Sequence, residues 1–220
     1  MMREIVLPGT FLGNFNKKKA GKGTFIENDK IYSSRLGIVE EKGDYINVIP
    51  LSGIYEPNVG DSVIGIVQEA LRNAWIVDIN APYPSLLGVE ESPWKINYGE
   101  TAKYLKAGEM IIATIARIDE ARNIELTMKG KPCRKIENGI VIDIQPTKVP
   151  RVIGKNGSML SLIKKYTGCW IFVGQNGRIW LKCSEDKLAI AIEAIRKIEE
   201  EAHTIGLTQR IEKMLRDKNG

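Results

Sequence analysis

The sequence predicts an α+β protein built from three small modules: an N-terminal β-rich domain, a five-stranded β-barrel and a C-terminal module with the order β-α-α-β-β-α. Residues 1–130 consist of short apolar runs interrupted by glycine, asparagine and proline, which is the spacing of strands and turns. After residue 131 the pattern changes to alternating strand and helix signals and ends in a long amphipathic run. A chain of 220 residues has room for two or three such modules.

Residues 1–58 are predicted to form the small β-rich domain. The segments "GTFIENDKIYSS" and "DYINVIPLS" alternate apolar and polar residues, and Asn-Asp or Gly separates one run from the next. No helix of ordinary length fits this part of the sequence.

Residues 59–130 contain five strand-like runs separated by turns, the spacing of a small antiparallel barrel. Val59-Gly60-Asp61 and Ala107-Gly108-Glu109 each precede a run of β-branched residues, so each is predicted to be the turn that opens a strand.

Residues 131–220 switch between strand and helix periods. A strand is expected within 139–146, a short helix up to residue 153, and a second helix over 157–168. A hairpin over 169–183 is expected to turn at Gln175-Asn176-Gly177. A long amphipathic helix over 184–206, with Ser184 as its N-cap, and a last helix over 207–217 complete the module.

Positive charge is concentrated in this last module. The whole chain has 32 Lys and Arg against 27 Asp and Glu, but residues 131–182 carry ten basic and two acidic residues, whereas residues 59–130 carry seven and ten. A polyanion is therefore the expected partner of the C-terminal module. On charge alone, a solvated basic face that serves solubility remains an alternative.

Several functional classes are not favoured. Three cysteines without C-x-x-C spacing, and a single histidine, His203, without nearby ligands, support neither a disulfide framework nor a metal site. The acidic residues form no group with a histidine or serine, so we expect no catalytic residues and no cofactor. Without a signal peptide or a membrane-length apolar run, we expect a soluble, cytoplasmic protein.

The segment "VPRVIGKNGSML" places Gly154-Lys155-Asn156-Gly157 between two predicted helices. Two glycines let a phosphodiester backbone lie against the main chain, and the N–H groups that open the second helix face the phosphates. Lys155 supplies charge in the loop itself. The flanking cations expected to add to it are Arg151, Lys148 and Lys164.

Within the order β-α-α-β-β-α, this loop makes residues 139–203 similar to a KH domain, whose G-x-x-G loop clamps about four nucleotides of single-stranded nucleic acid. The resemblance implies that bases enter an apolar groove beside the loop. Its candidate residues are Ile144, Val152, Ile153 and Ile171, and for each of them plain core is the favoured interpretation. Trp170 and Trp180 are expected to fill the space between sheet and helices.

The middle module resembles an RNA-binding OB-fold barrel of the ribosomal S-one type. "NAWIVD" (73–78) stands where that family has a Gly-Ala-Phe-Val strand, and residues 117–129 match its closing segment. The family often continues its third strand with a histidine-containing motif, where this chain has "LLGVEE" (86–91). Trp75 is therefore the remaining candidate platform for base stacking. The expected RNA path over the barrel comprises Arg72, Trp75, Lys103 and Arg117.

Taken together, the three modules resemble the archaeal exosome RNA-binding cap subunit, which carries an S-one-type OB domain and a KH domain. The resemblance implies a non-catalytic protein that recruits single-stranded RNA. Three copies would sit on a hexameric ring of phosphorolytic subunits, with the N-terminal domain docked on the ring and RNA guided inward for 3′-to-5′ degradation. An RNA-binding transcription or translation factor, or a structural scaffold of an RNA-processing complex, remains an alternative.

Overall fold

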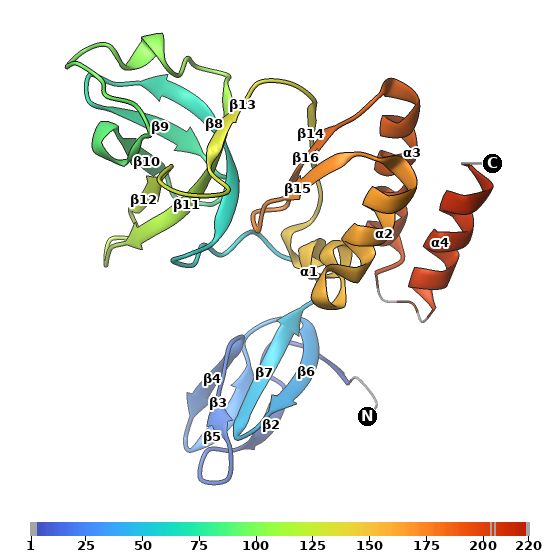
Figure 1. Ribbon diagram of the computed structural model, residues 1–220. Helices are drawn as coiled ribbons and strands as arrows, with labels where there is room; N and C mark the ends of the chain where they lie inside the picture. Colours follow the sequence, from blue (N-terminus) through green and yellow to red (C-terminus); the bar gives the residue numbers. More distant parts are fainter. Residues whose placement is uncertain (1–3, 203, 205, 219–220) are drawn as a thin grey trace. The chain divides into compact units, whose positions relative to one another are not determined.

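A computed structural model describes residues 4–202, 204 and 206–218 (Figure 1); His203 lies outside this set. The chain divides into two compact units, Met1–Gly53 and Ile54–Gly220. Among the described residues, no helix has both the length and the apolar character needed to cross a membrane.

The first unit consists of two small β-sheets. One is a four-stranded sheet in the order β1-β6-β7-β3, and the other is a three-stranded antiparallel sheet in the order β2-β5-β4. The strands are β1 Ile5–Val6, β2 Phe11–Asn14, β3 Lys19–Ala20, β4 Thr24–Glu27, β5 Lys30–Ser33, β6 Gly37–Lys42 and β7 Tyr45–Pro50. Its buried apolar side chains are Val6, Ile31, Ile46 and Val48. The described part of this unit contains strands and no helix, as the sequence predicted.

The second unit begins with a closed five-stranded barrel. Its strands are β8 Ser62–Ala70, β9 Ala74–Asp78, β10 Ser85–Gly88, β11 Met110–Ile118 and β12 Ile124–Thr127. They pair in the order β8-β9-β10-β12-β11, and β11 returns to β8 to close the barrel. All pairs are antiparallel except β10 and β12. The predicted OB-fold barrel is thereby confirmed.

One further strand, β13 (Arg134–Ile136), pairs with β11 at the side of the barrel. An ion pair of 2.7 Å between Lys135 Nζ and Glu109 Oε2 accompanies this pairing. The Lys135 ammonium, by its hydrogen bond, lowers the pKa of the Glu109 carboxyl. The chain that leaves the barrel is therefore held against it before the next module begins.

The C-terminal module has the predicted order β-α-α-β-β-α. A three-stranded sheet, ordered β14-β16-β15, is covered on one face by helices (Figure 1). Its elements are β14 Ile140–Asp143, α1 Val149–Ile153, α2 Ser158–Thr167, β15 Trp170–Val173, β16 Arg178–Lys182, α3 Glu185–Glu200 and α4 Leu207–Asp217. A 3-10 turn, Pro146–Lys148, leads into α1. The long helix ends at Glu200, earlier than the pattern predicted.

Strand alternation gives the sheet of this module two different apolar faces. Ile179 and Leu181 on β16 point into the helix-covered core, whereas Trp180 between them packs with Ile64 and Ile112 of the barrel. The prediction that Trp170 and Trp180 fill the space between sheet and helices is therefore wrong for both. Trp180 belongs to the contact between the sheet and the barrel, and Trp170, which packs on Trp180, is 39% exposed.

The structure also contains a disulfide between Cys169 and Cys183, which join the two outer ends of the β15–β16 hairpin. The cysteine spacing predicted no disulfide framework, and that prediction is wrong for this pair. The two cysteines are 14 residues apart in sequence, and the hairpin register places Trp170 opposite Lys182, so the residues just outside this pair also meet. Cys133 remains a free thiol.

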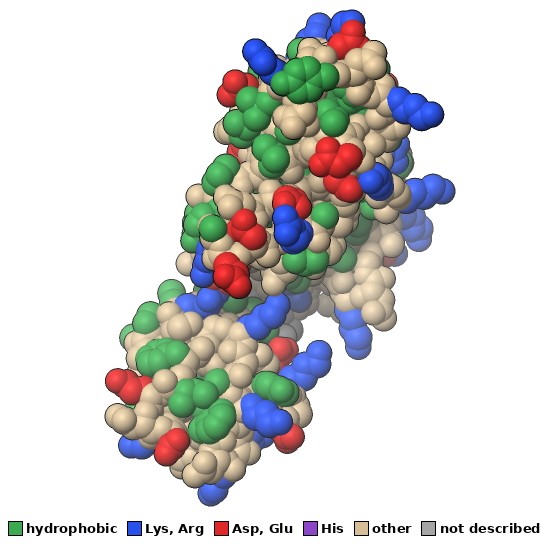
Figure 2. Space-filling view, turned by 90° about the vertical axis from the view of Figure 1, so that its left-hand side faces the viewer, with side chains coloured by type: hydrophobic (Ala, Val, Ile, Leu, Met, Phe, Trp, Pro, Cys, Tyr) green, Lys and Arg blue, Asp and Glu red, His purple; other side chains and the backbone are tan. Residues whose placement is uncertain are grey.

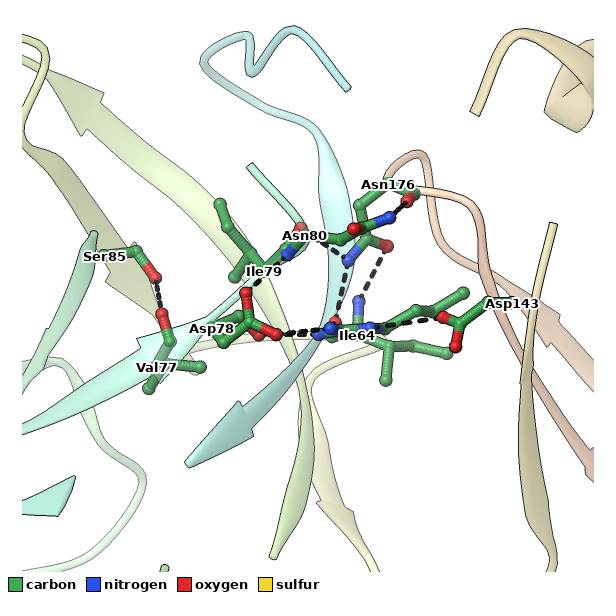
Figure 3. A network of polar contacts seen from close by, with 9 residues as sticks. Ile64, Val77, Asp78, Ile79, Asn80, Ser85, Asp143 and Asn176 are labelled. Atoms are coloured by element: carbon green, nitrogen blue, oxygen red, sulfur yellow. Dashed lines mark hydrogen bonds and ion pairs between the residues drawn. The ribbon is translucent and has the colours of Figure 1, made fainter. Parts of the chain in front are cut away.

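The inner end of the same hairpin is inserted against the barrel (Figure 3). Asn176 is completely buried, and its side-chain Nδ2 donates to the carbonyl oxygens of Ile64 (2.8 Å) and Ile79 (2.9 Å). Its Oδ1 accepts from the Ile64 N–H at 3.3 Å, and its own carbonyl accepts from Asn80 Nδ2 at 3.0 Å. One turn residue thus satisfies backbone groups of β8 and of Ile79, which directly follows β9.

Arg178, two residues later, reinforces this contact. Its guanidinium donates to the carbonyl oxygens of Asp78 (2.6 Å) and Ile64 (3.2 Å), and it forms an ion pair with the Asp78 carboxylate. A second carboxylate, that of Asp143 on β14, lies 3.4 Å from Arg178 Nε. Because Arg178 is only 7% exposed, its charge is compensated where water has little access.

Replacing Arg178 with methionine tests this contact. Arg178→Met keeps much of the side-chain volume, but it leaves the Asp78 carbonyl without this donor, removes one of the two donors to the Ile64 carbonyl and breaks the ion pair with the Asp78 carboxylate. We expect the free energy of unfolding to fall by about 2–3 kcal/mol, the range for hydrogen bonds to charged groups, in urea denaturation. The control is Arg196→Met, whose half-exposed guanidinium bonds the Asp143 carbonyl. Equal losses in the two variants would contradict the importance of the buried contact.

A separate prediction concerns the contribution of the disulfide to stability. Replacing Cys169 and Cys183 together with serine should lower the free energy of unfolding by up to about 3 kcal/mol, because a closed loop of this length restricts the unfolded chain. Thermal denaturation under non-reducing conditions measures the loss, and Cys133→Ser is the matched control. A double variant as stable as the control would show that the bridge contributes nothing.

Candidate nucleic-acid interface

The G-x-x-G loop lies between α1 and α2, as the sequence predicted, and its backbone requires glycine. Gly154 has φ 74° and ψ 172°, a region open essentially only to glycine. Asn156 (φ 53°) and Gly157 (φ 76°) follow in the left-handed region, which asparagine tolerates better than most residues. The loop is closed by a hydrogen bond of 3.1 Å from the Gly157 N–H to the Gly154 carbonyl.

The two glycines of the loop have different structural roles. A Cβ on Gly154 would lie 2.7 Å from the Met159 nitrogen and 2.8 Å from its Cβ, so α2 packs directly on this residue. A Cβ on Gly157 would meet no atom within 4 Å. Gly154 therefore allows the close approach of the chain to α2, whereas Gly157 leaves open space at the start of the helix.

The beginning of α2 is arranged to attract an anion. No side chain caps its N-terminus, and its first turn contains no acidic residue. The N–H groups at a helix start carry partial positive charge, and the exposed Lys155 adds a whole charge beside them. A phosphate group placed here would gain hydrogen-bond donors and a favourable field.

The structure brings the flanking cations to the loop only in part. Arg151 is half-buried, and its Nη2 donates to the Thr204 carbonyl at 3.0 Å, so it supports the C-terminal segment. Lys148 is half-buried in the 3-10 turn before α1. Lys164 is exposed near the far end of α2, about 10 Å along the axis from Gly157 at 1.5 Å per residue. Lys155 is thus the solvent-exposed cation of the loop proper.

The predicted base groove is largely core. Ile144, Val152 and Ile171 are each at most 5% exposed within the helix-covered cluster, and Ile153 packs partly against it. The three buried residues are unavailable to a base in this structure, because strand and helix periods turn them inward.

The prediction that Trp75 lies on the RNA path is wrong. It is completely buried in the barrel, packs edge-on against Trp94, and donates its indole N–H to the Leu105 carbonyl at 3.1 Å. Trp75 and Val77 alternate into the core, so the strand that resembles the family motif carries its aromatic side chain inward. It offers no exposed ring on which a base could stack.

The three predicted cations of the barrel do not form one path. Arg72 is exposed in the β8–β9 turn, and its carbonyl accepts from the Gly99 N–H, which places it near the 3-10 turn that carries Lys103. Arg117 lies near the end of β11, where the strand approaches the start of β8. Because β8 and β11 run antiparallel over nine residues each, Arg117 is at the other end of the barrel from Arg72.

Two of these cations are already engaged by carboxylates. Arg117 pairs with Glu125, and its hydrogen bond lowers the pKa of the Glu125 carboxyl. Lys103 pairs with Glu100 at 2.5 Å and, by its hydrogen bond, lowers the pKa of that carboxyl. Both pairs are exposed, so a phosphate could compete for each cation only against an ionised neighbour. The barrel surface is thus a weaker anion site than the loop.

The residues that sequence reasoning missed are those that join the barrel to the C-terminal sheet. Asn176 was identified only as a turn residue, and Arg178 had no assigned role. Their partners lie about 100 residues away in the chain, so no local pattern reveals them. The only local signal was the Asn-Gly turn, which predicts a hairpin but not what its tip contacts.

Comparison with known proteins gives two family matches. A family model described as the exosome RNA-binding protein RRP4 N-terminal domain matches residues 3–52, and a KH domain model matches residues 139–187.

Curated relatives match almost the whole chain. The exosome complex component Rrp4 of Methanosarcina barkeri is 44% identical over 218 residues, which cover 99% of this chain and 84% of that protein. The protein of the same name from Pyrococcus furiosus is 46% identical over 222 residues, covering 98% and 84%. A crystal structure described as that of a candidate exosome complex RNA-binding protein superposes with a TM-score of 0.70 at 42% identity, and covers 76% of this chain and 97% of its own.

The loop geometry predicts unequal effects of the two glycines. Gly154→Ala combines a glycine-only conformation with a clash against α2, and should cost at least about 2 kcal/mol. Gly157→Ala adds only left-handed strain, about 1 kcal/mol. Urea denaturation of both variants measures the difference. Equal destabilisation would contradict the different packing of the two positions.

Proposed function

Because this chain belongs to the Rrp4 family of exosome components, we propose that it is a non-catalytic RNA-binding cap subunit. It recruits single-stranded RNA and guides it into a phosphorolytic ring for 3′-to-5′ degradation. The observation that carries this proposal is the G-x-x-G loop, with its left-handed backbone, exposed Lys155 and uncapped helix start.

The loop binds the RNA backbone. The RNA backbone passes across Gly157, where there is open space, and its phosphates face the first N–H groups of α2. Lys155 adds a salt-dependent attraction, and the excess of ten basic over two acidic residues in 131–182 raises the local concentration of RNA.

The barrel guides RNA rather than binding it tightly. Its module carries seven basic and ten acidic residues, and Lys103 and Arg117 are paired with carboxylates. Contacts with RNA there are local and weak, through Arg72 and Lys103 at one end of the barrel and Arg117 at the other. A weakly binding surface suits a guide, because RNA must move past it.

The N-terminal unit docks on the ring. Figure 2 shows apolar side chains gathered on the surface of this unit, the lower body in that view. Phe11, Tyr32 and Phe25 form a row across β2, β5 and β4, with ring centroids 5.9 and 5.6 Å apart, and Phe11 and Phe25 are 51% and 40% exposed. An exposed aromatic row of this kind suits a protein–protein interface.

In this proposal the chain works as three modules, residues 1–58 for docking, 59–130 for guiding and 131–220 for RNA capture. Three copies sit on a hexameric ring in the cytoplasm. The ring supplies the catalysis.

The alternatives fit the chain less well. An elongation factor of this kind carries two KH modules, and the phosphorolytic nuclease places its KH module before the barrel, whereas this chain has one KH module after the barrel. A pure scaffold would have no need of an exposed cationic G-x-x-G loop in its most basic segment.

Reversing the charge of the loop tests the proposal. Lys155→Asp with Asn156→Asp should weaken single-stranded RNA binding at least about tenfold, because two carboxylates would then face the phosphates. The slope of log affinity against log salt should fall by about 0.7 for each phosphate that the variant no longer neutralises. Filter-binding titrations from about 50 to 200 mM salt measure both quantities.

The matched control is Lys42→Asp with Asn28→Asp, the same two changes at exposed positions of the N-terminal unit. It should bind RNA like the unmodified chain. An unchanged affinity in the loop variant, or equal losses in loop and control variants, would show that the loop is not the clamp.

A further inference from the structure

A hollow of about 490 Å³ lies at the end of the C-terminal sheet, away from the G-x-x-G loop. The described residues that line it include two cations and no carboxylate. They are Arg134, Gly168, Trp170, Trp180, Lys182 and Cys183. We call this hollow the Trp170 notch. Neither the loop clamp nor the barrel path makes use of it.

The floor of the notch is aromatic. Trp170 on β15 and Trp180 on β16 approach with ring centroids 4.3 Å apart, and Phe172 lies parallel to Trp170 at 6.5 Å. Trp180 is 4% exposed because it packs against the barrel, but Trp170 is 39% exposed. A large indole left this open, at the edge of an otherwise buried cluster, is a surface for stacking.

The rim of the notch is cationic. The Arg134 guanidinium, carried by β13 beside the barrel, lies 4.9 Å from the Trp170 ring centre and 5.7 Å from that of Trp180. Lys182 is exposed directly opposite Trp170 in the hairpin register. Flat guanidinium and indole groups together accept a planar base, and two cations beside them accept a phosphate.

The position of the notch relates it to the G-x-x-G loop. Gly168 ends α2, whose other end begins at the loop, so about 15 Å of helix separates the two sites at 1.5 Å per residue. Exposed Lys164 and Lys165 stand on the last turn of α2, just before Gly168. Two exposed cations therefore stand on the helix that connects the loop to the notch.

We propose that the Trp170 notch is a second RNA site, which binds one nucleotide of the same single strand that the G-x-x-G loop clamps. The base stacks on Trp170, and the adjoining phosphate lies between Arg134 and Lys182. This inference rests on the proposed RNA-binding function and extends it: strands long enough to reach both sites are held more tightly than those that fill the loop alone.

Charge complementarity and an exposed aromatic ring together favour a nucleic acid over other occupants. A second basic hollow of about 480 Å³, between α3 and α4, has several cations in its lining, including Lys197 and Lys213, but no aromatic residue among those described. It offers electrostatic attraction without a stacking surface. A comparison of variants in the two hollows therefore separates the contribution of the indole to RNA affinity from that of charge.

The test uses the full chain and two oligouridylates, one of four nucleotides and one of twelve. Trp170→Ala should weaken binding of the 12-mer by about fivefold or more, the loss expected for one stacked base, and leave the 4-mer within about twofold of its original affinity. Trp170→Phe should restore most of the 12-mer affinity, because phenylalanine keeps a stacking face. Fluorescence anisotropy of labelled RNA measures all of these affinities.

The cations are tested by Lys182→Gln, with Lys213→Gln in the α3–α4 hollow as the matched control. Lys182→Gln should reduce the salt slope for the 12-mer by about 0.7, and Lys213→Gln should not change it. Equal effects of the two would overturn the proposal in favour of diffuse attraction.

Other results are equally decisive. If the unmodified chain binds both RNAs and Trp170→Ala leaves the 12-mer unchanged, the notch is not an RNA site, while the proposed function stands. If Trp170→Ala lowers only the thermal midpoint, the aromatic stack is structural. If the unmodified chain binds neither RNA, the proposed function itself fails. Binding of a polyglutamate peptide at Trp170 without any RNA effect would assign the notch to an acidic protein partner.

Discussion

The second unit depends on one buried contact, the packing of the β15–β16 turn against β8 and the end of β9 in the barrel. Asn176 is fully buried and bonds the backbone of Ile64 and Ile79, and Arg178 brings a charge into the same place, where Asp78 and Asp143 compensate it. Buried polar groups are costly unless paired, so this arrangement admits few alternatives. The barrel and the RNA-binding module therefore form one compact unit, although each resembles a separate domain in sequence.

This contact explains how the surfaces of the C-terminal module are divided. One face of its sheet carries Ile179 and Leu181 into the helix-covered core, which supports α1, the loop and α2. The other face carries Trp180 against the barrel and leaves Trp170 exposed at the margin. The loop is thus supported by the helix-covered face of the sheet. The Trp170 notch lies on the opposite face, at the margin of the area that the barrel covers.

Much of this fold follows from local sequence signals, and the failures have a common cause. The barrel and the β-α-α-β-β-α order were predicted from apolar periodicity and turn residues, and the G-x-x-G loop from two glycines in that context. Sequence patterns did not predict three features: the inward direction of Trp75, the bridge from Cys169 to Cys183, and the burial of Asn176 against the barrel. Asn176 meets barrel residues about 100 positions away in the chain, and periodicity alone sets neither the strand face that Trp75 occupies nor the bonding of the two cysteines at the hairpin ends.

In the proposed function, the start of α2 binds single-stranded RNA. Amide chemical-shift mapping of the isotope-labelled full chain, titrated with a four-nucleotide RNA, tests it most directly. The largest shifts should fall on residues 154–160, the loop and the first turn of α2, with small shifts across the barrel. Shifts confined to the barrel or the N-terminal unit, with residues 154–160 unaffected, would contradict it.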